Sequence, residues 1–422
     1  MKKHFLLLMI LFVSGLIVAN KAFSQIIYPS TQKKLIDFGW HSPSTSDMKD
    51  NIKKYEIAPF DGVAMKIAKD AGAGNVFMVK QWKEVTAEAK ERERKIVSGI
   101  PKSSVLTDNF LSLYGGSQMD WFSDDDWKLV VDQLKYTAQL AKACKCKGIL
   151  WDPEPYKPGR NPWRYKEQEG NENIQYQKFY EQVRKRGAQF IKVLQDEFPG
   201  LVILSLREFS DFQDGSPFSQ RVLPVIDPDK AISRIENSWW ALHVPFTVGI
   251  LDAINPDVVF IDANEEAYFY TSELEYYKVR DILKNGGRVL VPKELHSKFA
   301  SQYQIGHAIS ADYTCGNWLG LSSFPYRLKG QASMLTPEER SLWFEHNAYY
   351  SLLTADEYVW LYTERANWWT NENVPPGFAD ALIRAKKKVA NREPLGFNVE
   401  EMMKAARDKA EKVEQEKKNA PK

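Results

Sequence analysis

The sequence predicts an α/β fold, a (β/α)8 TIM barrel with extended βα loops and a charged C-terminal helix. Eight short apolar runs rich in branched residues alternate with segments of helical spacing. The runs are nearly continuous, as expected for parallel strands covered on both faces. No glycine-rich phosphate turn follows the first run, which argues against a dinucleotide-binding sheet. The predicted strands are 35–40, 61–67, 104–109, 148–151, 201–206, 257–262, 288–291 and 357–362.

Helix start and stop signals lie between these runs. Ser123 is followed by three aspartates, an acidic N-terminal cap, and Thr336 opens a Thr-Pro-Glu-Glu start. Pro199-Gly200 marks the end of the helix predicted at 173–198. A dense charge run at 84–95 is expected on a solvated helix face. The other predicted helices are 47–57, 123–144, 173–198, 239–254, 271–285 and 336–353.

The two ends of the chain differ from the barrel region. Residues 1–24 have a basic start, an apolar stretch and small residues before Gln25, which predicts a cleaved signal peptide. The alternative is a membrane anchor, but about 15 apolar residues are fewer than the ~20 that a span needs. We therefore expect a periplasmic or secreted protein with no membrane span after cleavage. Residues 25–397 are the predicted barrel, and 398–422 a charged tail, helical and then frayed.

Charge and composition limit the possible partners. The 57 Lys and Arg residues nearly balance the 55 Asp and Glu residues, which excludes a bulk electrostatic surface for nucleic acid. Aromatic residues make up 13% of the chain, enough for a core and for rings that stack on a ligand. The pairing of Cys144, Cys146 and Cys315 stays open. The histidines form no zinc signature, so we expect neither a metal nor a cofactor.

Polar and aromatic residues follow every predicted strand, which is where chemistry lies in such barrels. Any single acid there is more often a helix cap, but a run of eight such ends indicates a polar pocket with carboxylates facing each other. The residues expected to bind substrate are Trp40, His41, Lys66, Asp108, Tyr156, Arg207, Glu208, Asp262, Asn264, Trp318, Asn367, Trp368 and Trp369.

The sharpest motif runs from Gly148 to Tyr156 and contains Asp152-Pro-Glu154-Pro. In extended chain the two carboxylates point the same way, so they titrate as a pair and one pKa rises. A carboxyl group with a raised pKa can protonate a glycosidic oxygen near neutral pH. The alternative is that both acids form ion pairs with Arg160 or Arg164.

A second group of residues follows the last strand. Glu364 ends an apolar run, and Trp368-Trp369 come just beyond it. Rings at a polar rim suit stacking on the faces of sugars. The alternative is that these tryptophans pack under a loop.

The Gly148-x-x-x-Asp152-x-Glu154 pattern resembles the D-x-E ending of chitinase-like glycoside hydrolases. There the Glu is the acid and the Asp orients a substrate acetamide. Glu154 is also similar in position to the fourth-strand acid/base of the large retaining barrel clan, whose nucleophile follows strand 7, where this chain offers Glu294. Leu150 and Pro153 depart from the two patterns. The segment from Gly39 through Pro59-Phe-Asp-Gly resembles uncharacterised exported bacterial glycosidase-like barrels.

These observations predict an exported glycoside hydrolase acting on an oligo- or polysaccharide. Glu154 is the expected general acid/base, with Asp152 raising its pKa or positioning a substrate group. Candidates for the opposing carboxylate are, in order, Glu364, Glu294 and Glu265. A serine hydrolase is excluded by the lack of a Gly-x-Ser-x-Gly elbow. The alternatives are a non-catalytic carbohydrate-binding barrel of a glycan-uptake system and a metal-dependent hydrolase or lyase.

Overall fold

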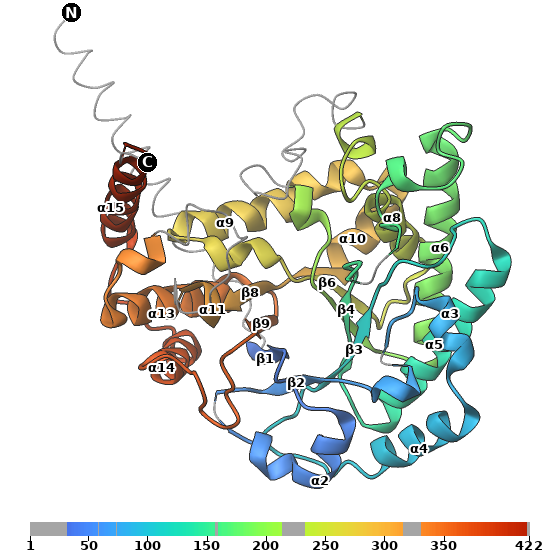
Figure 1. The fold of residues 1–422 in the computed structure, drawn as a ribbon, viewed down its shortest axis with the longest axis horizontal. Helices are drawn as coiled ribbons and strands as arrows, with labels where there is room; N and C mark the ends of the chain where they lie inside the picture. Colours follow the sequence, from blue (N-terminus) through green and yellow to red (C-terminus); the bar gives the residue numbers. More distant parts are fainter. Residues whose placement is uncertain are drawn as a thin grey trace, which may run out of the picture. The chain divides into compact units, whose positions relative to one another are not determined.

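A computed structural model describes residues 32–57, 59–72, 74–156, 159–212, 233–314 and 331–419. Within these ranges the strands gather at the centre and the helices lie around them (Figure 1). The strands are β1 (Lys34–Gly39), β2 (Gly62–Met65), β3 (Phe110–Tyr114), β4 (Gly148–Asp152), β5 (Val202–Ser205), β6 (Val259–Asp262), β7 (Tyr303–Ile305), β8 (His307–Ser310) and β9 (Tyr358–Thr363).

The strands form one parallel sheet in the order β7-β6-β5-β4-β3-β2-β1-β9-β8. The first and last strands are hydrogen-bonded neighbours, with Lys34 opposite Tyr358. Only Gly306 separates β7, which pairs with β6, from β8, which pairs with β9. The single segment from Tyr303 to Ser310 therefore closes the ring, and the predicted parallel barrel is confirmed.

Alternate residues of each strand face opposite sides. Ile36, Phe38, Tyr358 and Trp360 belong to a cluster inside the barrel, whereas their neighbours such as Val359 pack with residues of the surrounding helices. The sheet is therefore buried on both faces, which explains why its strands read as continuous apolar runs.

The helices alternate with the strands as predicted. Ser123 accepts a hydrogen bond from the Asp126 N–H, and Thr336 forms a capping box with Glu339. The two predicted helix starts are therefore confirmed. The helices are α2 (Thr45–Tyr55), α3 (Val79–Glu84), α4 (Ala87–Ser98), α5 (Asp124–Ala143), α6 (Tyr176–Glu197), α8 (His243–Ala253), α9 (Glu273–Asp281), α10 (His296–Gln302), α11 (Ala311–Thr314), α13 (Pro337–Thr354), α14 (Phe378–Asn391) and α15 (Glu400–Asn419).

Two predicted strands are wrong. The strand expected at 104–109 starts later, at Phe110, because the Ser103 hydroxyl accepts the N–H groups of Val105 and Leu106 and holds a turn there. Residues 288–291 overlap a 3-10 helix, Gly287–Leu290, and the seventh strand is the segment Tyr303–Ser310. Both errors move polar residues away from the strand ends where they were expected.

The start of α15 packs against α13. Val399, Met403 and Ala406 are buried with Trp343 and Leu335, while the residues after 406 are mostly exposed. Throughout the described part of the chain, no helix combines the length and apolar character needed to cross a membrane.

Candidate active site

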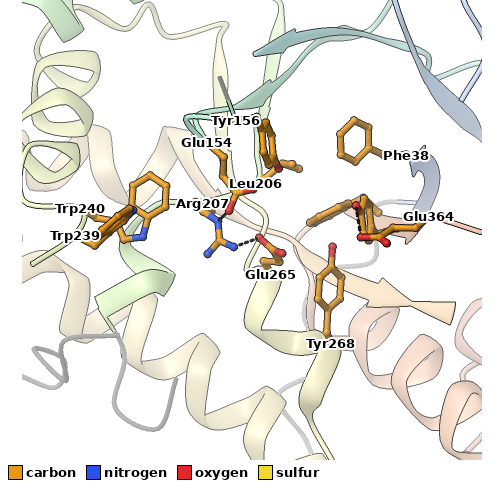
Figure 2. A pocket seen from close by; sticks show the side chains of 12 residues that line it. Phe38, Glu154, Tyr156, Leu206, Arg207, Trp239, Trp240, Glu265, Tyr268 and Glu364 are labelled. Carbon is orange, nitrogen blue, oxygen red and sulfur yellow. Dashed lines mark hydrogen bonds and ion pairs between the residues drawn. The ribbon is translucent and has the colours of Figure 1, made fainter. Parts of the chain in front are cut away.

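A cavity of about 470 Å³ lies among residues at the carboxyl ends of the strands, above the barrel interior (Figure 2). Its lining joins acids, one arginine and a wall of aromatic rings. The lining residues are Phe38, Glu154, Tyr156, Leu206, Arg207, Trp239, Trp240, Glu265, Tyr268, Trp360, Tyr362 and Glu364.

Glu154 is held by the backbone around it. Its N–H donates to Oδ1 of Asp152 (3.1 Å), the last residue of β4. The Trp163 indole donates to the carbonyl of Pro153 (2.7 Å), and Gly115, after β3, lies so close to that carbonyl that a Cβ would be 2.6 Å from its oxygen. The loop is thus fixed on two sides, and the flanking prolines restrict it further.

Arg207, two residues after β5, organises one wall of the cavity. Its Nε donates to Glu154 (2.7 Å), one Nη to Glu265 (2.7 Å) and the other to Asp211 (3.2 Å). The guanidinium lies 5.5 Å from the centre of the Trp240 ring. Figure 2 shows Glu154 and Glu265 both directed at Arg207. The alternative ion pairs of Glu154 with Arg160 or Arg164 do not form; those arginines pair with Glu169 and Glu167.

Glu265 reaches the cavity because the chain turns sharply after β6. Asn264 has a φ of +33°, and its carbonyl accepts the N–H of Ala267 to begin the 3-10 helix Glu265–Phe269. Asparagine is among the few residues that tolerate positive φ.

Glu364 lies on the other side of the cavity from Arg207 (Figure 2). The Tyr362 hydroxyl donates to its carboxylate (3.1 Å). The buried carboxylate of Asp312, after β8, accepts the N–H groups of Glu364, Arg365 and Ala366. Asp312 therefore fixes the turn that carries Glu364.

Several acidic side chains surround the single guanidinium of Arg207, and the pKa values of three of these acids are raised. Burial, then the charge of Glu154, raises the pKa of Asp152 to about 8. Burial raises the pKa of Asp211 to about 7 although Arg207 opposes the shift. Burial and the charge of Glu154 raise the pKa of Glu265 despite Arg207. One guanidinium cannot hold all these acids ionised in a poorly hydrated site, so the cluster keeps protons near neutral pH.

Two predicted site residues do not lie at this end of the barrel. Asp108 precedes β3, forms a 2.9 Å ion pair with Lys34 and accepts a hydrogen bond from Tyr358 (2.7 Å), at the amino ends of the strands. Glu294 is exposed in a short 3-10 helix before α10, and its charge acts on Arg184 of α6. Their expected positions were wrong because the third and seventh strands were misplaced.

Three other predicted residues are buried beside the cavity and do not line it. Glu208 accepts hydrogen bonds from Ser205 (2.8 Å) and from Thr247 of α8. Asp262 accepts two from Ser210 (2.6 and 2.8 Å) and one from the Tyr303 hydroxyl (2.7 Å). Asn264 contacts His307 (3.0 Å). These side chains support the loops that carry Arg207 and Glu265.

The predicted residues after β1 and β2 lie at the rim. Trp40 is 67% exposed, and His41 is also exposed. Lys66 donates to the carbonyls of Gly39 (2.8 Å) and Trp40 (2.9 Å) and so holds the turn that follows β1. None of the three lines the cavity, although Trp40 presents an open ring at the same end of the barrel.

The tryptophans after β9 pack under a loop. Trp368 is buried against Phe60, and Trp369 contacts Phe60 and Tyr55 of α2. Asn367 accepts the N–H of Trp369 (3.0 Å) and shapes this turn. The expected stacking role for this group is therefore not supported by its position. Trp318 and Cys315 lie outside the described residues.

Sequence reasoning missed most of the aromatic wall. Phe38, Trp360 and Tyr362 come from inside β1 and β9, where a two-residue period already separates them from the outward-facing positions. Trp239 and Trp240 form an adjacent aromatic pair before α8, and this pair is visible in the sequence. Asp211 gave no signal, because it lies in a 3-10 helix beyond the strand end.

Cys144 and Cys146 are buried free thiols with their sulfur atoms 3.0 Å apart, on the helical side of the barrel. Among the residues with assigned positions, no group of three His, Cys, Asp or Glu side chains is arranged to hold a metal ion.

No protein-family model and no curated protein matches the chain. Its structure is similar to that of a candidate sugar phosphate isomerase/epimerase from Anabaena variabilis, with 13% identity over 87% of this chain and 100% of that one and a TM-score of 0.39. It is also similar to a glycoside hydrolase family 5 enzyme from Prevotella bryantii, with 11% identity over 82% and 88% of the chains and a TM-score of 0.42. A third similar structure is an O-GlcNAc hydrolase from Thermobaculum terrenum, with 9% identity over 91% and 63% of the chains and a TM-score of 0.40. At these values the likenesses carry no argument about activity.

The class that the strand pairing and the cavity define is thus a parallel (β/α)8 barrel with a carboxylate- and aromatic-lined cavity at the carboxyl ends of its strands. Any narrower assignment depends on the chemistry of this cavity.

Proposed function

We propose that the chain is an exported glycoside hydrolase that cleaves an oligo- or polysaccharide by carboxylate acid/base catalysis. One observation carries this proposal. Carboxyl groups from three strand ends share one aromatic-lined cavity, with Glu154 and Glu265 on the Arg207 side and Glu364 on the other. Opposed carboxyl groups with a sugar between them are what glycoside hydrolysis requires.

In this proposal the proton comes from the Arg207 wall. A carboxyl group there, Glu154 in our assignment, protonates the glycosidic oxygen as the C–O bond breaks. If Glu364 has bonded to the anomeric carbon, Glu154 then takes the proton of the water that hydrolyses this bond. The pKa of Asp152, which burial raises to about 8, keeps a proton in this cluster near neutral pH. Glu364 attacks the anomeric carbon or activates water, and the anomer formed, read by proton NMR, tells which: retention fits carboxyl groups ~5–5.5 Å apart and inversion ~6.5–9.5 Å.

Glutamine variants test the assignment. We expect Glu154→Gln and Glu364→Gln to lower kcat at least about a hundredfold, because each loses a carboxyl group that transfers a proton or meets the anomeric carbon. The measurement is product release from a panel of aryl glycosides and polysaccharides, with circular dichroism to check folding.

Glu294→Gln is the matched control, because this glutamate is exposed and does not line the cavity. It should keep full activity. Full activity in Glu154→Gln would remove Glu154 from the mechanism. If activity is lost in Glu265→Gln but not in Glu154→Gln, the acid is Glu265, the other glutamate paired with Arg207.

The alternative is a non-catalytic carbohydrate-binding barrel of a glycan-uptake system. It is favoured by the ion pairs that occupy Glu154 and Glu265. It predicts that glycans stabilise the protein against heat while no glycosidic bond in the panel is cleaved.

Export rests on the sequence of residues 1–24, which lie outside the described part of the chain. We expect the exported protein to begin at Gln25, as read by N-terminal sequencing of the periplasmic or secreted fraction. A protein that keeps its first 24 residues would contradict cleavage.

A further inference from the structure

The cavity carries more acid than base. Among the described residues that line it, Glu154, Glu265 and Glu364 are acidic and Arg207 is the one basic side chain. Two further acids, Asp152 and Asp211, are 1% and 2% exposed and lie beside this lining.

The positive charge of Arg207 is already engaged. Each of its three donor nitrogens meets a different carboxylate, those of Glu154, Glu265 and Asp211, at 2.7–3.2 Å. A carboxylate, sulfate or phosphate on a substrate would therefore have to compete with protein carboxylates for this guanidinium, and it would be repelled by them.

The remaining wall also favours positive charge. Phe38, Tyr268 and Trp360 present aromatic rings to the cavity, and the faces of such rings attract cations. The Trp240 ring already faces a cation, the guanidinium of Arg207.

Two buried oxygens mark where the acids are short of positive partners. Oδ2 of Asp152 and Oδ2 of Asp211 have no hydrogen-bond partner. Burial raises the pKa of both groups although Arg207 lowers it, so the positive charge beside them does not offset the cost of burying them as ions.

We propose that this cavity selects a sugar that carries a free ammonium group, an amino sugar, over the corresponding neutral sugar and over a uronic acid. The proposal rests on the proposed function, in that the cavity takes a sugar, and adds the charge of that sugar. Its basis is the unequal number of acids and bases, with the single guanidinium shared by three carboxylates.

Matched pairs of monosaccharides test the preference for a positively charged sugar without assuming which sugar the cavity binds. Glucosamine and glucose, galactosamine and galactose, and mannosamine and mannose differ only at carbon 2. Binding is measured by calorimetry at pH 6, where the amines are protonated, with glucuronate and galacturonate as anionic probes. In at least one pair the amine should bind about tenfold more tightly, and this ratio should fall at high ionic strength. Equal affinities within every pair, or tighter binding of a uronate, would overturn the proposal.

Charge variants assign the effect to the cavity. Glu265→Gln should lower the amine-to-hydroxyl affinity ratio at least about threefold, because it removes a carboxylate of the lining. Glu294→Gln removes an equal charge elsewhere and should leave the ratio unchanged. An equal drop in both variants would mean that the net charge of the protein, not the cavity, attracts the amine.

Hydrolysis is measured separately from binding. If a neutral glycan is cleaved and no amine preference is found, the proposed selectivity is refuted but the proposed hydrolase activity is not. If amino sugars bind preferentially and no glycan is cleaved, the hydrolase activity is refuted but the selectivity is not.

Discussion

Asp152 lies in surroundings that disfavour the ionised form of its carboxyl group. It is 1% exposed, its Oδ1 accepts a hydrogen bond from the Glu154 N–H, and Glu154 adds a second negative charge nearby. The pKa of about 8 that follows means that the folded chain holds a proton which the unfolded chain releases near pH 4.

Asp152→Asn should change how stability depends on pH. The folded wild-type chain binds more protons than the unfolded one between about pH 4 and pH 8, so its free energy of unfolding falls as pH rises through this window. Asparagine has no proton to lose. Relative to the wild type, the variant should therefore gain at least about 1 kcal/mol between pH 5 and pH 8, against a limit of about 1.4 kcal/mol per pH unit. Urea unfolding at both pH values measures the difference.

Asp108→Asn is the contrasting control. Burial tends to raise the pKa of Asp108, but hydrogen bonds from Thr107, Lys34 and Tyr358 outweigh it, and the pKa is lowered. The stabilisation from this group is present above the unfolded pKa and lost only in acid. This variant should be destabilised equally at pH 5 and pH 8. A wild-type-like pH profile in Asp152→Asn would contradict the buried proton.

Several lining residues could be predicted from the sequence because the fold fixes where a parallel strand ends. Glu154, Arg207, Glu265 and Glu364 each follow a strand by one to three residues, and all reach the cavity. Trp368 could not be placed in this way, since it comes after a turn whose direction depends on contacts with Phe60. Position after a strand is informative only for the first few residues.

At the scale of elements, the segment Tyr303–Ser310 joins β6 to β9 through a single glycine. A Cβ on Gly306 would lie 2.8 Å from the carbonyl oxygen of Tyr358 and 3.2 Å from Ile261. This tight passage also explains the mistaken seventh strand. The glycine divides the true strand into two short runs, whereas the apolar residues 288–291 form one continuous run in a helical turn.

Gly306→Ala should destabilise the barrel by about 2 kcal/mol, because the new methyl group meets a backbone oxygen that can move only with its strand. Gly286→Ala is the control, since its Cβ would meet only Ile282, at an ordinary 3.8 Å. Denaturant unfolding compares the two. Equal stability in both variants would mean that β9 yields easily at this point.

At the scale of the whole molecule, the charged tail differs from the barrel in what it contributes. Among the described side chains, the buried ones that anchor α15 belong to its start, where Val399, Met403 and Ala406 pack with Trp343. A chain that ends after Arg407 should melt within about 1 °C of the full chain, whereas one that ends after Phe397 should melt several degrees lower, because Trp343 loses its cover. Thermal unfolding of the two truncations tests this, and an equal loss in both would show that the exposed turns also stabilise the fold.

The hydrogen bonds between β1 and β9 join the two extremes of the barrel, from Lys34 opposite Tyr358 to Gly39 opposite Thr363. No ring can exist until residue 363 has been synthesised, so the growing chain carries an open edge on its first strand until that point. If the chain is exported as we propose, this late pairing is an advantage, because the barrel cannot close before its last strand has been made and the unfinished chain can still cross the membrane unfolded.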